Sequence, residues 1–171
     1  MSAVSHVSFY SVPPGCLSSG LSRLPASKPR SERRLIYFSD TELRCKCGCG
    51  AVELQEGFAE ALDNLRAVYG YPMIPNSACR CPDHNRMVGG HHNSLHLTFN
   101  PHWNTKTCAI DVARPSADRL GTLVEVALRR GFSVGLAPTF VHLDWRSQCC
   151  IIPADRELGT VQHKPPVLWT Y

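Results

Sequence analysis

The sequence predicts one domain that mixes helices and strands, because both kinds of periodicity occur in it. In segments 52–69 and 117–130, apolar residues recur at steps of three and four, which is the spacing of one helix face. Segments 107–113 and 140–146 have the β-branched or alternating character of strands. A chain of 171 residues, 43% of them hydrophobic, is large enough for one core with tails.

Residues 1–36 are predicted to form a flexible leader. They are rich in Ser, Pro and Arg and show neither helical nor strand periodicity. They contain no apolar run of signal-peptide length, and the positive charges at Arg23, Lys28 and Arg30 come late. We therefore expect no signal peptide, and a domain that begins near Tyr37.

The first helix is expected over 52–69, where Gly70 and Pro72 stop it. Residues 71–77 then indicate a short extended segment, and the stretch after Arg80 indicates a turn that leads to a Gly-rich loop. The helix is assigned to the core, since its apolar stripe consists of Leu54, Phe58, Leu62, Leu65 and Tyr69.

The second half of the domain is expected to be strand, helix and strand. Asp111 interrupts the apolar strand 107–113, and a carboxylate in such a place needs a partner. Ser116 is a plausible N-cap for the helix at 117–130, which Gly131 ends. In 140–146, His142 and Asp144 share one strand face. Residues 149–171 are predicted to be a C-terminal tail.

Charge and hydropathy exclude some classes of function. The net charge is +4, and the basic residues are scattered rather than gathered into a stripe, so we expect no nucleic-acid partner. The sequence has no run of about 18 apolar residues, so we expect no membrane span. Nothing in the sequence indicates oligomerisation, and a monomer is expected by default.

Nine cysteines are many for this length, and their odd number leaves at least one unpaired if the others form disulfides. Incidental thiols, disulfides and a structural zinc cluster are all open interpretations. Alternation in Cys45, Cys47 and Cys49 does not match the usual Cys-x-x-Cys knuckle, which lowers the weight of the zinc interpretation.

Two imidazoles and one carboxylate stand out as candidate metal ligands: His96, Asp111 and His142. This is a common ligand set for catalytic zinc, with a fourth position left for water. Such a metal activates water and polarises a scissile carbonyl at neutral pH. Asp144 is a candidate partner for a ligand imidazole or a proton acceptor.

Several motifs, in chain order, resemble the zinc D-Ala-D-Ala carboxypeptidase family, which includes phage endolysins that cut L-Ala-D-Glu bonds and shares its fold with the Hedgehog signalling domain. The resemblance implies an α+β fold with a small antiparallel sheet flanked by helices, in a domain spanning 37–148. It also implies zinc on the three candidate ligands, and Arg80 placed to grip a substrate carboxylate or carbonyl. The motifs are Ser77-Ala78-Cys79-Arg80-Cys81-Pro82-Asp83-His84-Asn85, Gly89-Gly90, Asn93-Ser94-Leu95-His96, Ala109-Ile110-Asp111, Gly131-Phe132 and Phe140-Val141-His142-Leu143-Asp144-Trp145-Arg146.

The sequence departs from this family in two places. Fifteen positions separate His96 from Asp111 (111 − 96 = 15), more than is usual in the family, so an insertion must loop out between them. The alternative is that His102, inside the insertion, replaces His96 as a ligand. Thr139 stands where many relatives carry an acidic general base, and Asp144 is the candidate substitute. Ser94 is assigned to the site as a hydrogen-bonding or substrate-binding residue.

The expected function is therefore hydrolysis of peptide bonds in peptidoglycan stem peptides by a zinc peptidase of the carboxypeptidase or endopeptidase type. A phage endolysin or a virion-borne enzyme is the expected setting, acting at the bacterial cell wall. The alternative function is a non-catalytic zinc-binding module of the same fold, part of a phage structure or a wall-binding protein. Loss of the acid at Thr139 favours that alternative.

Overall fold

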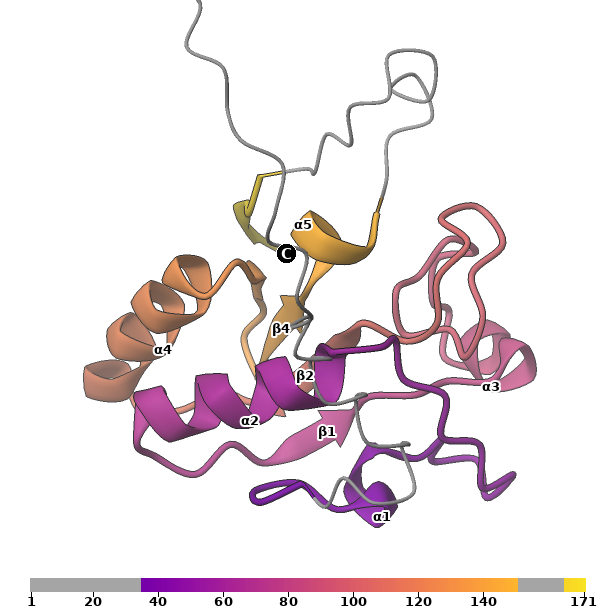
Figure 1. Cartoon of the computed structure of the whole chain (residues 1–171), viewed down its shortest axis with the longest axis horizontal. Coiled ribbons are helices and arrows are strands. Elements are labelled where there is room, and N and C mark those ends of the chain that lie inside the picture. Colours follow the sequence, from indigo (N-terminus) through magenta and orange to yellow (C-terminus); the bar gives the residue numbers. More distant parts are fainter. Residues whose placement is uncertain (1–34, 151–164) are drawn as a thin grey trace, which may run out of the picture. The chain divides into compact units, whose positions relative to one another are not determined.

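A computed structural model describes residues 35–150 and 165–171. All of the predicted leader except its last two residues lies outside these ranges. No helix in the described part of the chain is both long enough and apolar enough to cross a membrane. The elements, shown in Figure 1, are α1 (Asp40–Leu43), α2 (Phe58–Tyr69), β1 (Pro75–Ser77), α3 (Pro82–Met87), β2 (Ala109–Ala113), α4 (Ala117–Arg129), β3 (Ser133–Leu136), β4 (Phe140–Asp144), α5 (Arg146–Cys149) and β5 (Leu168–Thr170).

The strands form one sheet in the order β1-β2-β4-β3-β5. All neighbours pair antiparallel except β3 and β5, which are parallel. Helices α2 and α4 pack against each other, and Figure 1 shows α2 crossing in front of the sheet. The predicted fold class, α+β with a small antiparallel sheet flanked by helices, is thus confirmed, with one parallel edge strand added.

The alternating pattern of β4 divides the sheet into two faces. Val141 and Leu143 are fully buried in the core, while His142 and Asp144 point to the opposite face. Phe58 of α2 packs on Phe132, with 6.3 Å between ring centroids. Burying each such side chain contributes about 1.5–3 kcal/mol. Packing of Val141 and Leu143 in the core therefore fixes the position of β4, and with it the positions of His142 and Asp144 on the other face.

The first helix is shorter than the sequence predicts, since α2 begins at Phe58 rather than at Val52. The residues before α2 are not helical, because Leu54 forms a β-bridge with Thr107. Gly57 then adopts φ +78° at the helix start, a conformation that favours glycine. Apolar spacing continues through this segment, so periodicity alone extended the predicted helix too far.

Two predictions for irregular structure were wrong. The stretch after Arg80, expected to be a turn, contains α3, because Pro82 suits the first helical position and the Cys81 sulfur accepts a hydrogen bond from the His84 N–H at 3.4 Å. Residues 168–170 lie in the segment predicted to be a C-terminal tail, yet they form β5 at the sheet edge. Three residues are too few to show a period in the sequence.

Candidate metal centre and pocket

Strand register brings two of the three candidate ligands together. Asp111 of β2 lies directly opposite His142 of β4 in the antiparallel ladder, where neighbouring side chains on one face touch. His96 comes from the preceding loop, and its carbonyl accepts hydrogen bonds from the Arg80 N–H at 2.7 Å and the Thr107 hydroxyl at 3.1 Å. The loop is therefore fastened at the residue that completes the cluster.

Three ligand atoms converge in this cluster. His142 Nδ1 lies 2.8 Å from Asp111 Oδ1, and His96 Nε2 lies 3.2 Å from the same oxygen. The two ring nitrogens are 3.2 Å apart. Tetrahedral ligands at about 2.0–2.1 Å from zinc lie about 3.3 Å from one another. All three residues are buried, with at most 8% of their surface exposed.

The outer hydrogen bonds of the two imidazoles identify which nitrogens face the cluster. His96 Nδ1 lies 2.8 Å from the carbonyl of Ala78, and His142 Nε2 lies 3.2 Å from Asp144 Oδ2. Both acceptors need a ring N–H, which assigns the protons to these outer nitrogens. When both imidazoles are neutral, His96 Nε2 and His142 Nδ1 therefore carry lone pairs that face each other and the carboxylate of Asp111. Such a set of acceptors fits a cation between them.

The electrostatics of the cluster suit ligands in part. Burial would raise the pKa of Asp111, but the hydrogen bonds that His142 and His96 donate when their facing nitrogens are protonated outweigh burial and hold that pKa below its ordinary value. Burial lowers the pKa of His96, which favours the neutral imidazole that a metal needs. Burial also opposes charge on His142, yet hydrogen bonds to Asp111 and Asp144 raise its pKa, so a proton would compete with a metal there.

Arg80 is fastened to the cluster rather than left open. Its Nη2 donates to Asp111 Oδ2 at 2.6 Å, and its Nε donates to the Ser77 hydroxyl at 2.9 Å. The Arg80 side chain is 14% exposed. This contact leaves Asp111 Oδ1 to face the two imidazoles, so Arg80 orients the carboxylate. Its predicted role in gripping substrate stays a prediction.

Asp144 is bound on two sides. It accepts from His142 and forms a two-point ion pair with Arg146, whose Nε donates at 2.7 Å. Burial would raise the pKa of Asp144, but the hydrogen bonds from Arg146 and His142 lower it. A carboxylate with a lowered pKa is a weak base, so these contacts favour the predicted role as partner of a ligand imidazole.

One row of residues runs across the whole sheet through this cluster. In register, from β1 to β5, the row is Ser77, Asp111, His142, Gly135 and Trp169. A Cβ on Gly135 would lie 2.7 Å from the Trp169 ring. Glycine therefore lets the indole lie over the sheet, where its ring centroid is 5.6 Å from that of His142.

A pocket of about 230 Å³ opens beside the cluster. Strand β5 and its following residue supply Trp169 and Tyr171 to its wall, and the insertion supplies Trp103. Sequence analysis missed these aromatic residues and His91, because neither a tail nor a polar loop carries a pattern that predicts a pocket. The full lining is His91, Asn93, Ser94, Leu95, Trp103, His142, Asp144, Arg146, Cys150, Trp169 and Tyr171.

Other predicted residues take defined places. Ser94 lines the pocket, and its hydroxyl accepts from the His96 N–H at 3.3 Å. His102, the alternative ligand, is exposed and stacks edge-on against Trp103, outside the cluster. The insertion loops out cleanly, since Asn100 and Thr105 bridge its neck. Thr139 is exposed in the turn between β3 and β4.

Comparison with known proteins supplies a family. No curated protein matches the sequence. Residues 36–144, which are 109 of the 171 positions (144 − 36 + 1 = 109), match the family described as Peptidase M15. The matched range includes all three residues of the buried cluster as well as Arg80 and Asp144. With most of its length matched and a buried metal-ligand set beside a pocket, this chain belongs to the Peptidase M15 family.

Proposed function

We propose that this chain is a zinc-dependent peptidase that hydrolyses peptide bonds in the stem peptides of peptidoglycan, at the bacterial cell wall. One observation carries the proposal: three buried acceptor atoms, those of His96, Asp111 and His142, converge beside an open pocket. Membership of the Peptidase M15 family supports the peptidase class and the choice of zinc.

The residues of the chain have separate tasks in this proposal. His96, Asp111 and His142 hold the ion, which when bound activates water and polarises the scissile carbonyl. Asp144 accepts the Nε2–H of His142 and so keeps Nδ1 free for the metal. Arg80 orients Asp111 from the other side. The pocket aligns the substrate against this cluster.

The pocket wall fits a stem peptide that carries a carboxylate near the bond to be cut. Both a terminal D-Ala-D-Ala and an L-Ala-D-Glu linkage have such a carboxylate. Arg146 lines the pocket, 4.9 Å from the centre of the Trp169 ring, and would share its guanidinium between Asp144 and a substrate carboxylate. Trp103, Trp169 and Tyr171 provide apolar faces for the short side chains of Ala and for peptide planes.

A second candidate function is a wall-binding module of the same fold without turnover. The observation in its favour is that the described pocket offers no unpaired carboxylate as a general base. Thr139 is exposed and carries no acid, and among the described residues lining the pocket Asp144 is the one carboxylate, already paired with Arg146. Such a module would bind metal and stem peptide without cleaving it.

Digestion of purified peptidoglycan separates the two functions. Zinc-loaded protein, a chelated sample and His142→Ala are compared for released amino groups and free D-Ala, and Asp118→Asn on the exposed side of α4 serves as control. A peptidase releases product only with zinc and with His142 intact. Free D-Ala without new internal amino termini indicates a carboxypeptidase, and new D-Glu amino termini indicate an endopeptidase. Zinc-loaded protein that binds the wall without releasing product would exclude the enzyme and leave the binding module.

The setting of the enzyme, a phage endolysin or a virion-borne hydrolase, belongs to the same proposal. Lysis of wall-bearing cells from within, in cells that express the protein together with a membrane-permeabilising holin, tests the endolysin setting. Intact cells under these conditions, with active protein inside them, would speak against it.

A further inference from the structure

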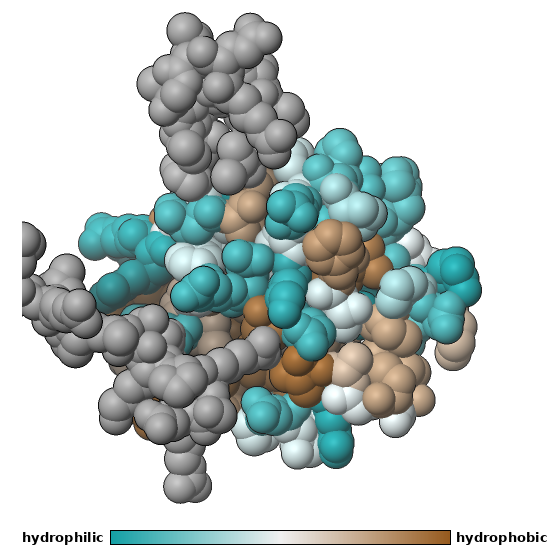
Figure 2. Space-filling view, turned by 45° about the vertical axis from the view of Figure 1, so that its right-hand side comes forward, coloured by the Kyte–Doolittle hydropathy of each residue, from teal (hydrophilic) through white to brown (hydrophobic). Residues whose placement is uncertain are grey.

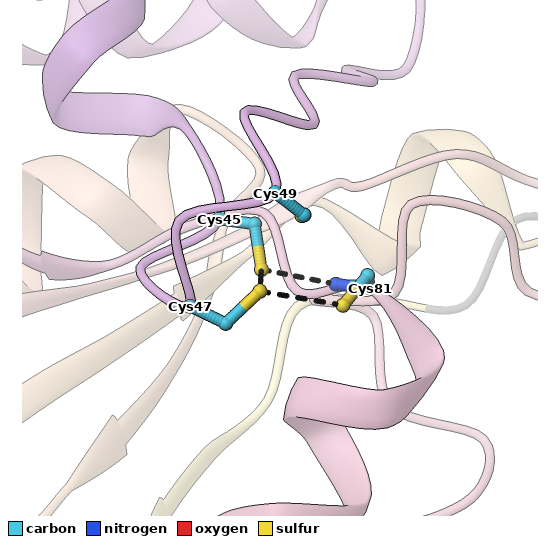
Figure 3. Close-up of side chains that lie close together, drawn as sticks. All are labelled: Cys45, Cys47, Cys49 and Cys81. Carbon is cyan, nitrogen blue, oxygen red and sulfur yellow. Dashed lines mark hydrogen bonds between the residues drawn. The ribbon is translucent and has the colours of Figure 1, made fainter.

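Four cysteine sulfurs gather at a second place, away from the histidine and aspartate cluster. Cys45, Cys47 and Cys49 lie in one loop, and Cys81 lies at the start of α3, more than 30 residues later in the chain. All four Sγ atoms lie within 4.8 Å of one another. Figure 3 shows Cys45, Cys47 and Cys81 meeting between the loop and the helix.

The spacing of these sulfurs distinguishes metal ligation from disulfides. Cys45 Sγ is 3.4 Å from Cys47 Sγ, and Cys47 Sγ is 3.7 Å from Cys81 Sγ. A disulfide requires about 2.05 Å. Four thiolates bound tetrahedrally at about 2.3 Å from zinc lie about 3.8 Å from one another. These two separations are too long for a disulfide and close to the edges of that tetrahedron, and the remaining pairs of sulfurs lie within 4.8 Å.

Local backbone geometry makes the alternating cysteines converge. In an extended strand, the Cα atoms of residues two apart lie about 6.6 Å from each other, so a turn brings their sulfurs closer together than a strand does. Here residues 46–49 form a turn that the Cys45 N–H closes by donating to the Ala51 carbonyl at 2.9 Å. Gly48 and Gly50 adopt φ of +91° and +74°, which favour glycine. The sequence Cys-Lys-Cys-Gly-Cys-Gly therefore forms a compact knuckle without the usual Cys-x-x-Cys spacing.

Hydrogen bonds support the sulfurs as they do in metal sites. The Cys81 N–H donates to Cys45 Sγ at 3.3 Å, and the His84 N–H donates to Cys81 Sγ at 3.4 Å. His84 Nδ1 lies 3.3 Å from Cys45 Sγ and can donate to it as well. Such N–H···S contacts disperse thiolate charge in ligand shells. Two of the four thiols, Cys47 and Cys49, are exposed, where free thiols are open to oxidation.

We propose that Cys45, Cys47, Cys49 and Cys81 form a structural zinc site that fastens the 45–49 loop to the start of α3. All four positions of the tetrahedron are protein ligands, so the site is closed and takes no substrate. Cys81 follows Arg80, whose guanidinium orients Asp111. The site therefore anchors the backbone next to the residue that supports the catalytic cluster.

Metal analysis of two complementary variants tests the site. The protein is purified under reducing conditions with zinc, and bound metal is counted by mass spectrometry. Wild type is expected to hold two zinc ions, and both His96→Ala/His142→Ala and Cys47→Ser/Cys81→Ser one each. Cys149→Ser, a partly buried thiol outside the cluster, is the matched control and is expected to hold two.

Cobalt gives a readout that does not depend on cleavage. In His96→Ala/His142→Ala loaded with Co²⁺, sulfur-to-cobalt charge-transfer absorption is expected in the near ultraviolet. The d–d bands and the intensity of the charge-transfer band should be unchanged when His84→Ala is added, whereas loss of an imidazole ligand would shift the d–d bands; this distinguishes four sulfur ligands from three sulfurs and one imidazole. A folded His96→Ala/His142→Ala protein that holds no metal, with four reactive thiols or a disulfide joining these cysteines, would overturn the site. This variant lacks the two histidine ligands of the first cluster, so its metal content reports on the cysteine site alone. A failure of the proposed peptidase, measured on peptidoglycan, is therefore distinguishable from a failure of this site.

Discussion

The two candidate metal sites differ in how the chain builds them. The cluster of His96, Asp111 and His142 is buried and takes two ligands from opposite positions on paired strands. The four-cysteine cluster takes three ligands from one turn and leaves two of its thiols exposed. Sheet register fixes the first site before any ion binds, whereas the second site relies on a loop that the ion itself would hold.

This difference predicts a difference in role. Three ligands beside a pocket leave a position for water and substrate, while four thiolates satisfy zinc completely. The first site is therefore suited to chemistry and the second to stability. Arg80 and Cys81, adjacent in the chain, belong to one site each.

The largest expected effect is that a change at the first site removes cleavage, whereas a change at the second site lowers the melting temperature. Asp111→Ala should reduce cleavage of peptidoglycan to the level of the chelated enzyme, because a ligand is lost. Cys47→Ser should lower the melting temperature by several degrees, at about 2–4 °C for each kcal/mol lost, while cleavage falls only modestly. Calorimetry and product release check both proteins. Equal loss of cleavage in the two variants would contradict the division of roles.

Asp144→Asn should weaken metal binding at the first site alone. An amide lacks the charge that stabilises the outer N–H of His142, and loss of such a partner typically lowers metal affinity by about 10–100-fold. Competition with a chromophoric chelator measures the change. Asp118→Asn, whose carboxyl is exposed, is the control and should bind metal as wild type does. Unchanged affinity in Asp144→Asn would show that the His142 contact is dispensable.

Gly135→Ala should displace Trp169 from the pocket wall. The added Cβ would meet the indole at 2.7 Å, and overpacking of this kind costs about 1–3 kcal/mol. Tryptophan fluorescence and the melting temperature report the shift, and KM should rise. Gly121→Ala in α4, with open space around its Cβ, should instead stabilise by about 0.5–1 kcal/mol. If both variants behave alike, β5 is not part of the pocket wall.

The smallest expected effect concerns the loop histidines. His91 lines the pocket, and its Nδ1 lies 3.0 Å from the Asn93 N–H. His91→Ala should raise KM a few-fold by removing a substrate contact. His92 stacks on His91 at 4.2 Å but does not line the pocket, so His92→Ala is the matched control. Steady-state kinetics on a soluble stem peptide compares them, and identical KM values would exclude the contact.

Sequence periodicity was most informative where one residue period governs packing. The alternation in 140–146 correctly separated core residues from His142 and Asp144, and the polar interruption at Asp111 correctly marked a residue with partners. It failed where a long-range contact decides local structure. Leu54 keeps its apolar spacing but pairs with Thr107, so the helix starts later than predicted.

The missing parts of the site have a physical reason as well. Trp169 reaches the pocket because β5 pairs with β3, a contact between residues more than 30 positions apart. Three residues carry no detectable strand period, and nothing in their composition names the partner strand. The usual Cys-x-x-Cys spacing does not predict the cysteine knuckle, because positive φ at Gly48 and Gly50 lets alternating cysteines converge in one turn.

The pairing of β5 with β3 makes one edge strand responsible for part of the pocket wall. Tyr171 lines the pocket, and the centroid of its ring lies 6.0 Å from that of Trp169. Hydrophobic and hydrophilic residues mix on the surface drawn in Figure 2. Any change that unpairs β5 from β3 would therefore take two aromatic side chains, Trp169 and Tyr171, from the pocket wall together.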